Sequence, residues 1–431
     1  MTKIVIIGAG SQFGGKLSLD IVSLPELRDS HIVLVDINEE RLAAVGKYVQ
    51  RIIDGHQLPA RVTTTTDRAE ALPGADFVVT SISVGGYAYA GFPASVEVEI
   101  PRRYGVEQSI ADTIGVGGIF RFLRTAPVQL AICQDIERFC PNALLLNYTN
   151  PMCMLTWVHS AASTIKNVGL CHSVQNTARE LSEYLQVPKE EIDYLCAGIN
   201  HQAWYLRFRH NGKDLYPALR EKLNDDETVA RDRVRFELFR HFGYYVTESS
   251  NHCSEYHPYF RRTPDLREQF GLKERQVAEI PPVRRWMNDS PDEPLPTLTQ
   301  SGEYAARIMQ AMISDTPYRF NGNVMNTNAG LIANLPSDCC VEVPCLVDKQ
   351  GVQPTQVGAL PAALAHLNLT NIAPQELAVR AVLDKDKEAA FHACALDPLT
   401  RSVCSLDQIR QMFDELWQTE SEAGLLEYWK A

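Results

Sequence analysis

The first half of the chain alternates short apolar runs with amphipathic segments. The apolar runs are rich in β-branched residues and end in glycine or polar residues, which predicts buried strands. Helical spacing predicts helices over Leu17–Leu24 and Glu39–Gly55. Apolar strands alternating with helices indicate a parallel sheet covered on both faces, so the expected fold class is α/β, a doubly wound, Rossmann-like sheet. The expected strands are Lys3–Gly8, His31–Ile37, Arg61–Thr65, Ala75–Ile82, Ala143–Asn147 and Val168–Cys171.

The pattern changes near residue 195. Longer helical stretches and irregular segments rich in proline and tyrosine follow, such as Tyr256–Pro264. We therefore predict two domains, residues 1–195 and residues 196–431, with the second α+β and mainly helical. Its expected C-terminal helices are Pro361–His366, Pro374–Leu383, Lys387–Ala395 and Leu406–Leu416.

Charge and cysteine content narrow the classes of partner. The 431 residues include 41 Lys and Arg against 53 Asp and Glu, a net charge of −12. A negative chain repels phosphate backbones and anionic membrane surfaces, so we expect no nucleic-acid or membrane partner. The 11 cysteines show no regular spacing, and no apolar run approaches the roughly 20 residues of a membrane span. We expect a cytoplasmic protein with reduced thiols.

A glycine-rich turn follows the first expected strand and opens the first helix. Gly8 permits a tight turn, and Gly10, followed by Ser11, lets a pyrophosphate approach the helix N-terminus. Phe13 stands where a third glycine is usual. Asp36 ends the second strand, where a carboxylate holds the ribose hydroxyls of NAD and repels the extra phosphate of NADP. We expect an NAD site in residues 1–195; the alternative is a glycine-rich turn of an unrelated α/β domain.

Polar residues also end the later strands. Cys171 ends the last expected strand and His201 lies 30 residues on, a pair that suits a borderline transition metal. The alternative is a buried cysteine beside a hydrogen-bonded histidine. Asn147 and Asn150 follow another strand, where their amides could bind sugar hydroxyls or the nicotinamide ribose, or simply form an Asn-Pro turn.

Several long motifs resemble glycoside hydrolase family 4, the NAD- and manganese-dependent glycosidases. The resemblance covers nearly the whole chain, and the bacterial α-galactosidase branch is its nearest match. Members that act on α-galacturonides, α-glucuronides and α-glucosides look similar. The motifs are GAGS at 8–11, GVEQSIADTIGVGGIFRFLRTAP at 105–127, NYTNPM at 147–152, GLCHSVQ at 169–175, CAGINHQAWYL at 196–206, GYYVTESSNHCSEYHPYF at 243–260, EYAARIM at 303–309 and GLIANLPSDCCVEVPCLVD at 330–348.

The resemblance implies roles for individual residues. Cys171 and His201 would ligate Mn²⁺, and Asn150 would bind substrate with Asn147 close by. A catalytic tyrosine falls in the segment around Tyr256, which we prefer, with Tyr259 as second choice. No basic residue lies between positions 87 and 99, which disfavours a 6-phosphoglycoside substrate.

The chemistry implied is oxidation at C3 by NAD⁺, loss of the C2 proton to a base, and elimination of the glycosidic bond. Tyr256 is the expected base, and His172 or Asp112 the expected proton donor to the leaving alcohol. We expect an α-galactosidase that forms a homodimer or homotetramer and acts on a small sugar. An α-galacturonidase or α-glucuronidase is the alternative, because Arg285, with Arg284, would suit a uronide carboxylate; an NAD-dependent hydroxy-acid dehydrogenase and a nucleotide-binding module are remoter ones.

Overall fold

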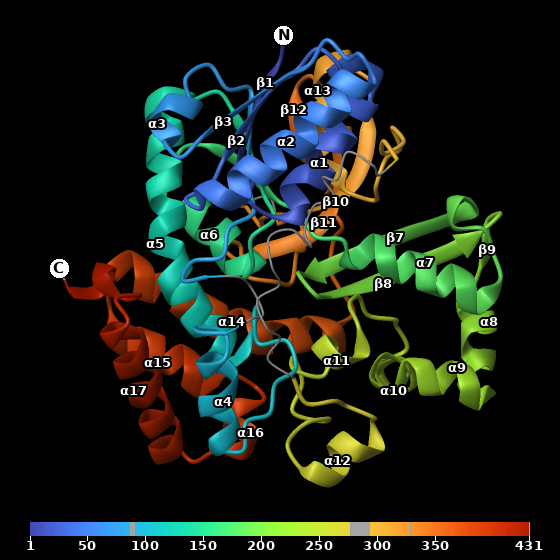
Figure 1. The fold of residues 1–431 in the computed structure, drawn as a ribbon. Coiled ribbons are helices and arrows are strands. Elements are labelled where there is room, and N and C mark those ends of the chain that lie inside the picture. Colours follow the sequence, from blue (N-terminus) through green and yellow to red (C-terminus); the bar gives the residue numbers. More distant parts are fainter. Residues whose placement is uncertain (87–90, 276–293, 328–329, 431) are drawn as a thin grey trace.

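A single mixed sheet of 12 strands runs through the molecule (Figure 1). The computed structural model describes residues 1–86, 91–275, 294–327 and 330–430. The sheet order is β3-β2-β1-β4-β5-β6-β10-β11-β7-β8-β9, and β12 pairs with β11. The strands are β1 (Lys3–Ile7), β2 (His31–Val35), β3 (Arg61–Thr65), β4 (Phe77–Thr80), β5 (Leu144–Asn147), β6 (Lys166–Gly169), β7 (Ile192–Ile199), β8 (Gln202–His210), β9 (Lys213–Asp214), β10 (Tyr318–Met325), β11 (Cys340–Asp348) and β12 (Gly351–Pro354).

The first six strands confirm the predicted doubly wound sheet. All are parallel, in the order 3-2-1-4-5-6. Successive residues of β1 enter different cores: Ile4 and Ile6 join one hydrophobic cluster, whereas Val5 and Ile7 join another. Both faces of the sheet are therefore buried at β1, and β2, β4 and β5 are buried in the same way, which explains their nearly continuous apolar runs. The edge strand β3 is mostly exposed.

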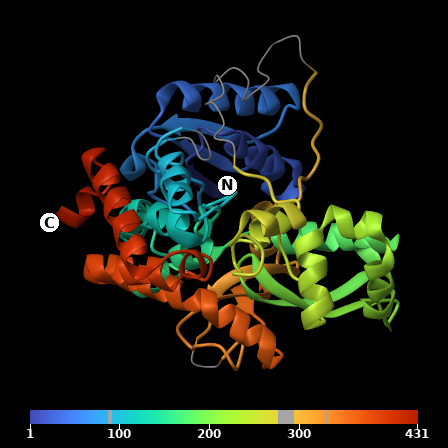
Figure 2. The ribbon, with the colours of Figure 1, turned by 90° about the horizontal axis from the view of Figure 1, so that it is seen from below.

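Helices lie along both faces and extend well beyond the sheet (Figures 1 and 2). They are α1 (Gln12–Ser23), α2 (Glu39–Gly55), α3 (Arg68–Ala71), α4 (Val96–Arg103), α5 (Gly115–Phe139), α6 (Met152–Ala162), α7 (Ser173–Leu185), α8 (Tyr216–Glu221), α9 (Asp226–Arg231), α10 (Arg233–Phe242), α11 (Ser250–Cys253), α12 (Pro264–Gln269), α13 (Tyr304–Ser314), α14 (Ala362–Asp384), α15 (Lys387–Leu396), α16 (Thr400–Val403) and α17 (Leu406–Glu422). In the described parts of the chain, no helix is both long and apolar enough to cross a membrane.

The second half of the chain continues the same sheet, which the sequence pattern did not predict. β10 and β11 pair antiparallel between β6 and β7, and β7 forms a hairpin with β8. These strands were missed because buried polar residues interrupt their apolar runs. Asn321 and Asn323 lie on β10 and Glu342 lies on β11, all at most 4% exposed. The β7–β9 hairpin and α7–α10 form a lobe at the right of Figure 1.

The C-terminal helices gather beside α4 and α5 (Figure 2). The two helices expected at Pro361–His366 and Pro374–Leu383 are one helix, α14, because Pro374 lies inside it without ending it. α15 and α17 confirm the other two expected helices. Phe120 on α5 packs against Phe413 of α17 with ring centroids 5.4 Å apart, so the end of the chain covers the long helix of the first half.

Candidate cofactor and metal site

The turn between β1 and α1 has the geometry of a dinucleotide cradle. Gly8 has a left-handed φ of +87°, and a Cβ there would lie 2.1 Å from the Ser81 carbonyl oxygen. A Cβ on Gly10 would lie 2.8 Å from the Asp36 carboxylate. The Gly10 N–H donates to Asp36 Oδ2 at 2.8 Å, and Ser11 accepts from the Gly14 N–H as the N-cap of α1. The turn brings Gly8, Gly10, Ser11 and Asp36 together. Only glycine fits at positions 8 and 10.

Gly14 performs the packing role of the third glycine, one position later than usual. A Cβ on Gly14 would lie 2.4 Å from the Ala9 carbonyl oxygen. The start of α1 therefore packs directly on the backbone of the turn, which aims its N–H groups at the cradle. Phe13 instead packs its ring on Tyr148, with centroids 4.6 Å apart. These residues fit a bound NAD.

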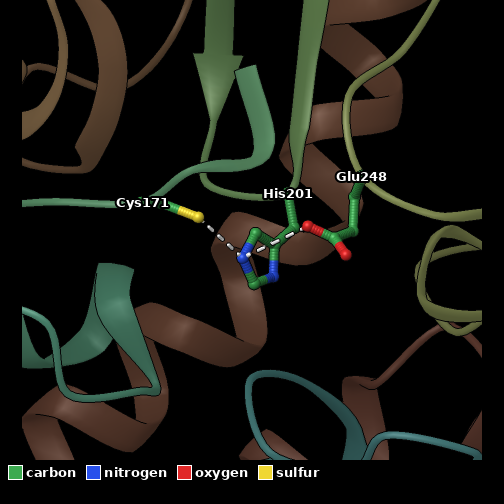
Figure 3. Close-up of side chains that lie close together, drawn as sticks. All are labelled: Cys171, His201 and Glu248. Atoms are coloured by element: carbon green, nitrogen blue, oxygen red, sulfur yellow. Dashed lines mark hydrogen bonds and ion pairs between the residues drawn. The ribbon is translucent and has the colours of Figure 1, made fainter. Parts of the chain in front are cut away.

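Three side chains converge beside the carboxyl end of β6 (Figure 3). Cys171 Sγ lies 3.1 Å from His201 Nε2, which lies 3.6 Å from Glu248 Oε2. One ligand atom from each residue lies within 4.8 Å of the others. Sulfur, nitrogen and oxygen donors in one cluster suit a divalent transition-metal ion, and sugar hydroxyls would complete the coordination with the oxygen ligands that Mn²⁺ prefers. His201 Nδ1 is buried without a hydrogen-bond partner among the described residues.

The ionisable groups of this cluster shift the pKa values of one another. Burial would raise the pKa of the Cys171 thiol, but the adjacent His201 lowers it. Burial would lower the pKa of His201, yet Cys171 and Glu248 raise it well above its usual range. For Glu248, burial is again outweighed, and His201 and His252 hold its pKa well below its ordinary value. The sulfur and the carboxylate are thus both anionic, the form in which each ligates a metal, whereas His201 would release its proton on binding one.

Glu248 is the residue of this cluster that the sequence analysis missed. It belongs to the TESSNH stretch and follows no strand, so no local pattern separates it from any other loop acid. The feature that distinguishes Glu248 is visible only in the structure: Glu248 and His201 both have left-handed backbone conformations, with φ +77° and φ +63°. The left-handed region costs a non-glycine residue roughly 1–2 kcal/mol, and strain of this kind concentrates at functional sites.

Tyr256 lies beside the cluster and Tyr259 does not. The Tyr256 ring is 6.5 Å from His201 and 5.6 Å from His252 between centroids. It is fully buried, and its hydroxyl has no hydrogen-bond partner among the described residues. Tyr259 is 47% exposed and stacks on His257 instead. The burial of the Tyr256 ring beside His201 and His252 therefore favours Tyr256 over Tyr259 as the expected base.

Asp112 and Asn150 form a pair on the other side of His252. Asn150 Nδ2 donates to Asp112 Oδ2 at 3.1 Å, and His252 Nε2 lies 3.9 Å from Asp112 Oδ1. Asn147 does not join them. Its side chain is buried, accepts from Thr80 and from the Thr149 N–H, and donates to the Thr149 carbonyl. The bonds of Asn147 hold the Asn-Pro turn, which leaves the half-buried Asn150 as the amide of the motif that faces Asp112.

His172 is held by an acid from a distant segment. Its Nε2 lies 3.0 Å from Glu303 Oε1, and Lys16 Nζ lies 3.3 Å from the same oxygen. The Glu303 side chain is 3% exposed and that of His172 is 47% exposed. Glu303 precedes α13 and Lys16 lies on α1 just after the cradle. His172 is therefore oriented at the border between the cradle and the metal cluster, an arrangement that its neighbours in the sequence do not reveal.

Two further groups of residues are candidates for contacting a sugar: arginines, which would bind a carboxylate, and aromatic rings, which would stack on a sugar face. Arg284, Arg285 and Trp286 lie outside the described residues. Arg261 is buried and donates to Ser254, Ser109 and the Glu107 carbonyl, so protein groups occupy its guanidinium. The other candidates for stacking on a sugar belong to hydrophobic cores: Trp204, Tyr205, Tyr244 and Tyr245.

Comparison with known proteins bears on what this site does. The model of the Family 4 glycosyl hydrolase matches residues 3–187, and the model of the Family 4 glycosyl hydrolase C-terminal domain matches residues 196–400. This chain belongs to glycosyl hydrolase family 4. It is 41% identical to an alpha-galactosidase of Bacillus subtilis (strain 168) over 98% of this chain and 99% of that protein. An alpha-galactosidase of Rhizobium meliloti (strain 1021) is 37% identical over 96% of this chain and 87% of its own length.

A solved glucosidase structure has the same fold. The 6-phospho-beta glucosidase of Thermotoga maritima, solved with manganese, NAD⁺ and glucose-6-phosphate, superposes with a TM-score of 0.78. The match covers 98% of this chain and 99% of that one at 20% identity. The similarity confirms that this family 4 glycosyl hydrolase has the Rossmann-like fold predicted from its sequence.

Proposed function

We propose that this family 4 glycosyl hydrolase cleaves α-galactosides with NAD⁺ and Mn²⁺. The observation that carries the proposal is the cluster of Cys171, His201 and Glu248 beside the carboxyl end of β6. This is the same end of the parallel sheet at which Gly8 and Gly10 form the cradle. The near-full-length similarity to two α-galactosidases supports the choice of sugar.

The chain's own residues bind and orient. Gly10, which has no side chain, lets the Asp36 carboxylate approach the turn, where it would hold the ribose hydroxyls, and the N-terminus of α1 would face the pyrophosphate. Cys171, His201 and Glu248 would hold the metal ion. Asn150, paired with Asp112, would bind a substrate hydroxyl from the opposite side of His252. When bound, NAD⁺ supplies hydride transfer and Mn²⁺ supplies Lewis-acid stabilisation of the charge that develops on the sugar oxygens.

Tyr256 is the proposed base that removes the C2 proton. In the protein alone, burial and the nearby charges of Cys153 and Asp112 raise the Tyr256 pKa well above its ordinary value, so its phenol is protonated. Activity therefore requires added positive charge near the hydroxyl, which a divalent ion held by His201 and Glu248 would bring. The proton donor to the leaving alcohol is His172 in this proposal, because it is partly exposed and oriented by Glu303. Asp112 is the alternative donor.

A panel of nitrophenyl sugars tests the proposal. With NAD⁺, Mn²⁺ and a reductant, we expect hydrolysis of the α-galactoside to exceed that of the β-galactoside, the α-galacturonide and the α-glucuronide. Preference for a uronide would favour the alternative specificity. Net accumulation of NADH without release of nitrophenol would support a dehydrogenase instead, because the glycosidase returns the hydride in each turnover.

The proposal extends to the setting of the enzyme. We infer that it works in the cytoplasm, as a homodimer or homotetramer, on a small sugar and without nucleic-acid or membrane partners. The exclusively free cysteines among the described residues support a reducing compartment. The division at residue 195 into an NAD-binding part and a part that completes the substrate and metal site also remains a prediction.

A further inference from the structure

The carboxylate of Glu255 accepts hydrogen bonds from the loop at residues 109–111, which is distant in the sequence. Glu255 is fully buried, and its Oε1 accepts the backbone N–H groups of Ser109 at 2.5 Å and Ile110 at 2.7 Å. Its Oε2 accepts the N–H of Ala111 at 3.2 Å. The N–H groups of three successive residues thus point at one carboxylate. Successive backbone N–H groups of this kind form a concave anion-binding site.

Side chains add further hydrogen bonds to the same carboxylate and loop. Gln108 Nε2 and Ser109 Oγ donate to the Glu255 carboxylate at 3.3 and 3.2 Å. Arg261 Nη2 donates to Ser109 Oγ at 2.8 Å. Hydrogen bonds to an ionised acceptor are the strong ones, and all of these lie in the interior of the protein. The loop is therefore fastened at Glu255 rather than by a regular element of its own.

The fastened loop leads directly to Asp112. Ala111 has a left-handed φ of +51°, a conformation that a residue with a Cβ avoids unless its surroundings impose it. The Ala111 N–H bound to Glu255 is the contact that imposes it. One residue later, Asp112 accepts from Asn150, whose carbonyl in turn accepts from Arg121 Nε at 3.2 Å.

Glu255 is also the neighbour of Tyr256 in sequence. One residue therefore fixes the loop that carries Asp112, and the next places its ring beside the rings of His201 and His252. A shift of the Glu255 side chain would change the distance between these two groups without touching the cradle at Gly8 or the cluster at Cys171. Catalytic geometry is sensitive to shifts of this kind.

We propose that Glu255 is a positioning residue that sets Asp112 and Asn150 relative to Tyr256 and the metal cluster. The proposal rests on the function proposed above for those residues. Glu255 itself touches no substrate; it acts through the loop at 109–111. Because its carboxylate faces only donors in this loop, an amide in its place would turn an N–H toward other N–H groups and release the loop.

The test compares Glu255→Gln with the matched control Glu137→Gln. Glu137 also accepts a backbone N–H, from Thr164, but lies on the outer end of α5. Hydrogen–deuterium exchange of the substrate-free proteins is the first measurement. We expect faster exchange at residues 109–112 in Glu255→Gln, with the segments around Gly10 and His201 unchanged. Unchanged exchange at 109–112, or faster exchange throughout the molecule, would overturn the proposal.

Kinetics form the second measurement, with whichever α-galactoside or α-galacturonide the wild type hydrolyses. We expect KM to rise about tenfold in Glu255→Gln, with NAD⁺ and Mn²⁺ dissociation constants unchanged. Adding Ala111→Gly, which removes the conformational penalty at φ +51°, should recover part of the lost affinity. A wild-type KM in Glu255→Gln would contradict the proposal, and so would equal losses of NAD⁺ and Mn²⁺ binding. A wild type that cleaves neither glycoside would refute the proposed function alone, because hydrogen exchange still decides the role of Glu255.

Discussion

At the scale of single residues, the site is assembled from groups that are far apart in sequence and unfavourable in isolation. His201 and Glu248 adopt left-handed backbone conformations, and Tyr256 keeps an unpaired hydroxyl in the interior. An orphaned buried polar group costs about 1–3 kcal/mol. Such costs are compensated only where the surrounding fold fixes the geometry, and we expect these three residues at the centre of the site.

Removing the carboxylate of Glu248 should weaken metal binding. We expect Glu248→Gln to raise the Mn²⁺ dissociation constant by about tenfold or more, equal to about 1.4 kcal/mol, because a neutral amide replaces an anionic oxygen donor. Titration calorimetry on the NAD-loaded protein measures it. Glu237→Gln, which changes an exposed acid on α10, serves as the control. An unchanged Mn²⁺ affinity in Glu248→Gln would exclude Glu248 as a ligand.

Replacing Tyr256 by phenylalanine should separate binding from chemistry. The variant loses only the hydroxyl, so NAD⁺ and Mn²⁺ affinities should stay near wild type while exchange of the C2 hydrogen with solvent stops. Mass spectrometry of a C2-deuterated substrate follows that exchange. Tyr259→Phe should retain it, because Tyr259 points away from the cluster. Wash-out of deuterium in Tyr256→Phe at the normal rate would place the base elsewhere.

At the scale of elements, sequence periodicity predicted the strands that consist of buried apolar residues. It missed the strands in which polar residues are buried. The strands β1, β2, β4 and β5 follow from their apolar runs, whereas β3, with the sequence RVTTT, is rich in β-branched residues but mostly exposed. β10 and β11 escaped because Asn323 and Glu342 face the interior. The same limit applies to the site: Cys171 and His201 end strands and were predicted, whereas Glu248 and Glu303 come from irregular segments whose position only tertiary packing fixes.

The contact between α1 and the cradle turn gives a prediction at this scale. A Cβ on Gly14 would lie 2.4 Å from the Ala9 carbonyl oxygen, so Gly14→Ala must push the start of α1 away from the turn. We expect NAD⁺ affinity to fall by about tenfold, with Mn²⁺ affinity unchanged. Asp36→Ala should cause a comparable loss by removing the ribose contact. Fluorescence titration with NAD⁺ measures both; full affinity in Gly14→Ala would show that α1 does not orient the cofactor.

At the scale of the whole molecule, one sheet joins the two halves of the chain. Gly169 of β6, Asn323 of β10, Glu342 of β11 and Gly198 of β7 are aligned across four neighbouring strands. Cys171 and His201 follow the outer two of these strands, so the continuity of the sheet brings the metal ligands of both halves together.

The free energy of unfolding of the whole molecule should decrease as the pH is lowered, because two histidines are buried in the neutral form. Burial lowers the pKa values of His159 and His257 to about 3 in the folded protein, whereas an unfolded histidine titrates near 6.5. Between these values the unfolded chain binds the extra protons, so acid favours unfolding. We expect each histidine to lower the free energy of unfolding by about 2 kcal/mol from pH 7 to pH 5. Urea unfolding of His159→Gln should show a pH dependence smaller by that amount; an identical dependence would contradict it.

The most direct test of the account asks whether hydrolysis depends on both groups that the site is built to hold. Protein freed of metal with a chelator and of nucleotide by dialysis is assayed on the nitrophenyl α-galactoside, first alone and then with NAD⁺, Mn²⁺ or both. The account predicts background release without additions and with either one, and full activity only with the two together. Full-rate release from the stripped protein would contradict it, because neither the cradle nor the Cys171 cluster would then take part in cleavage.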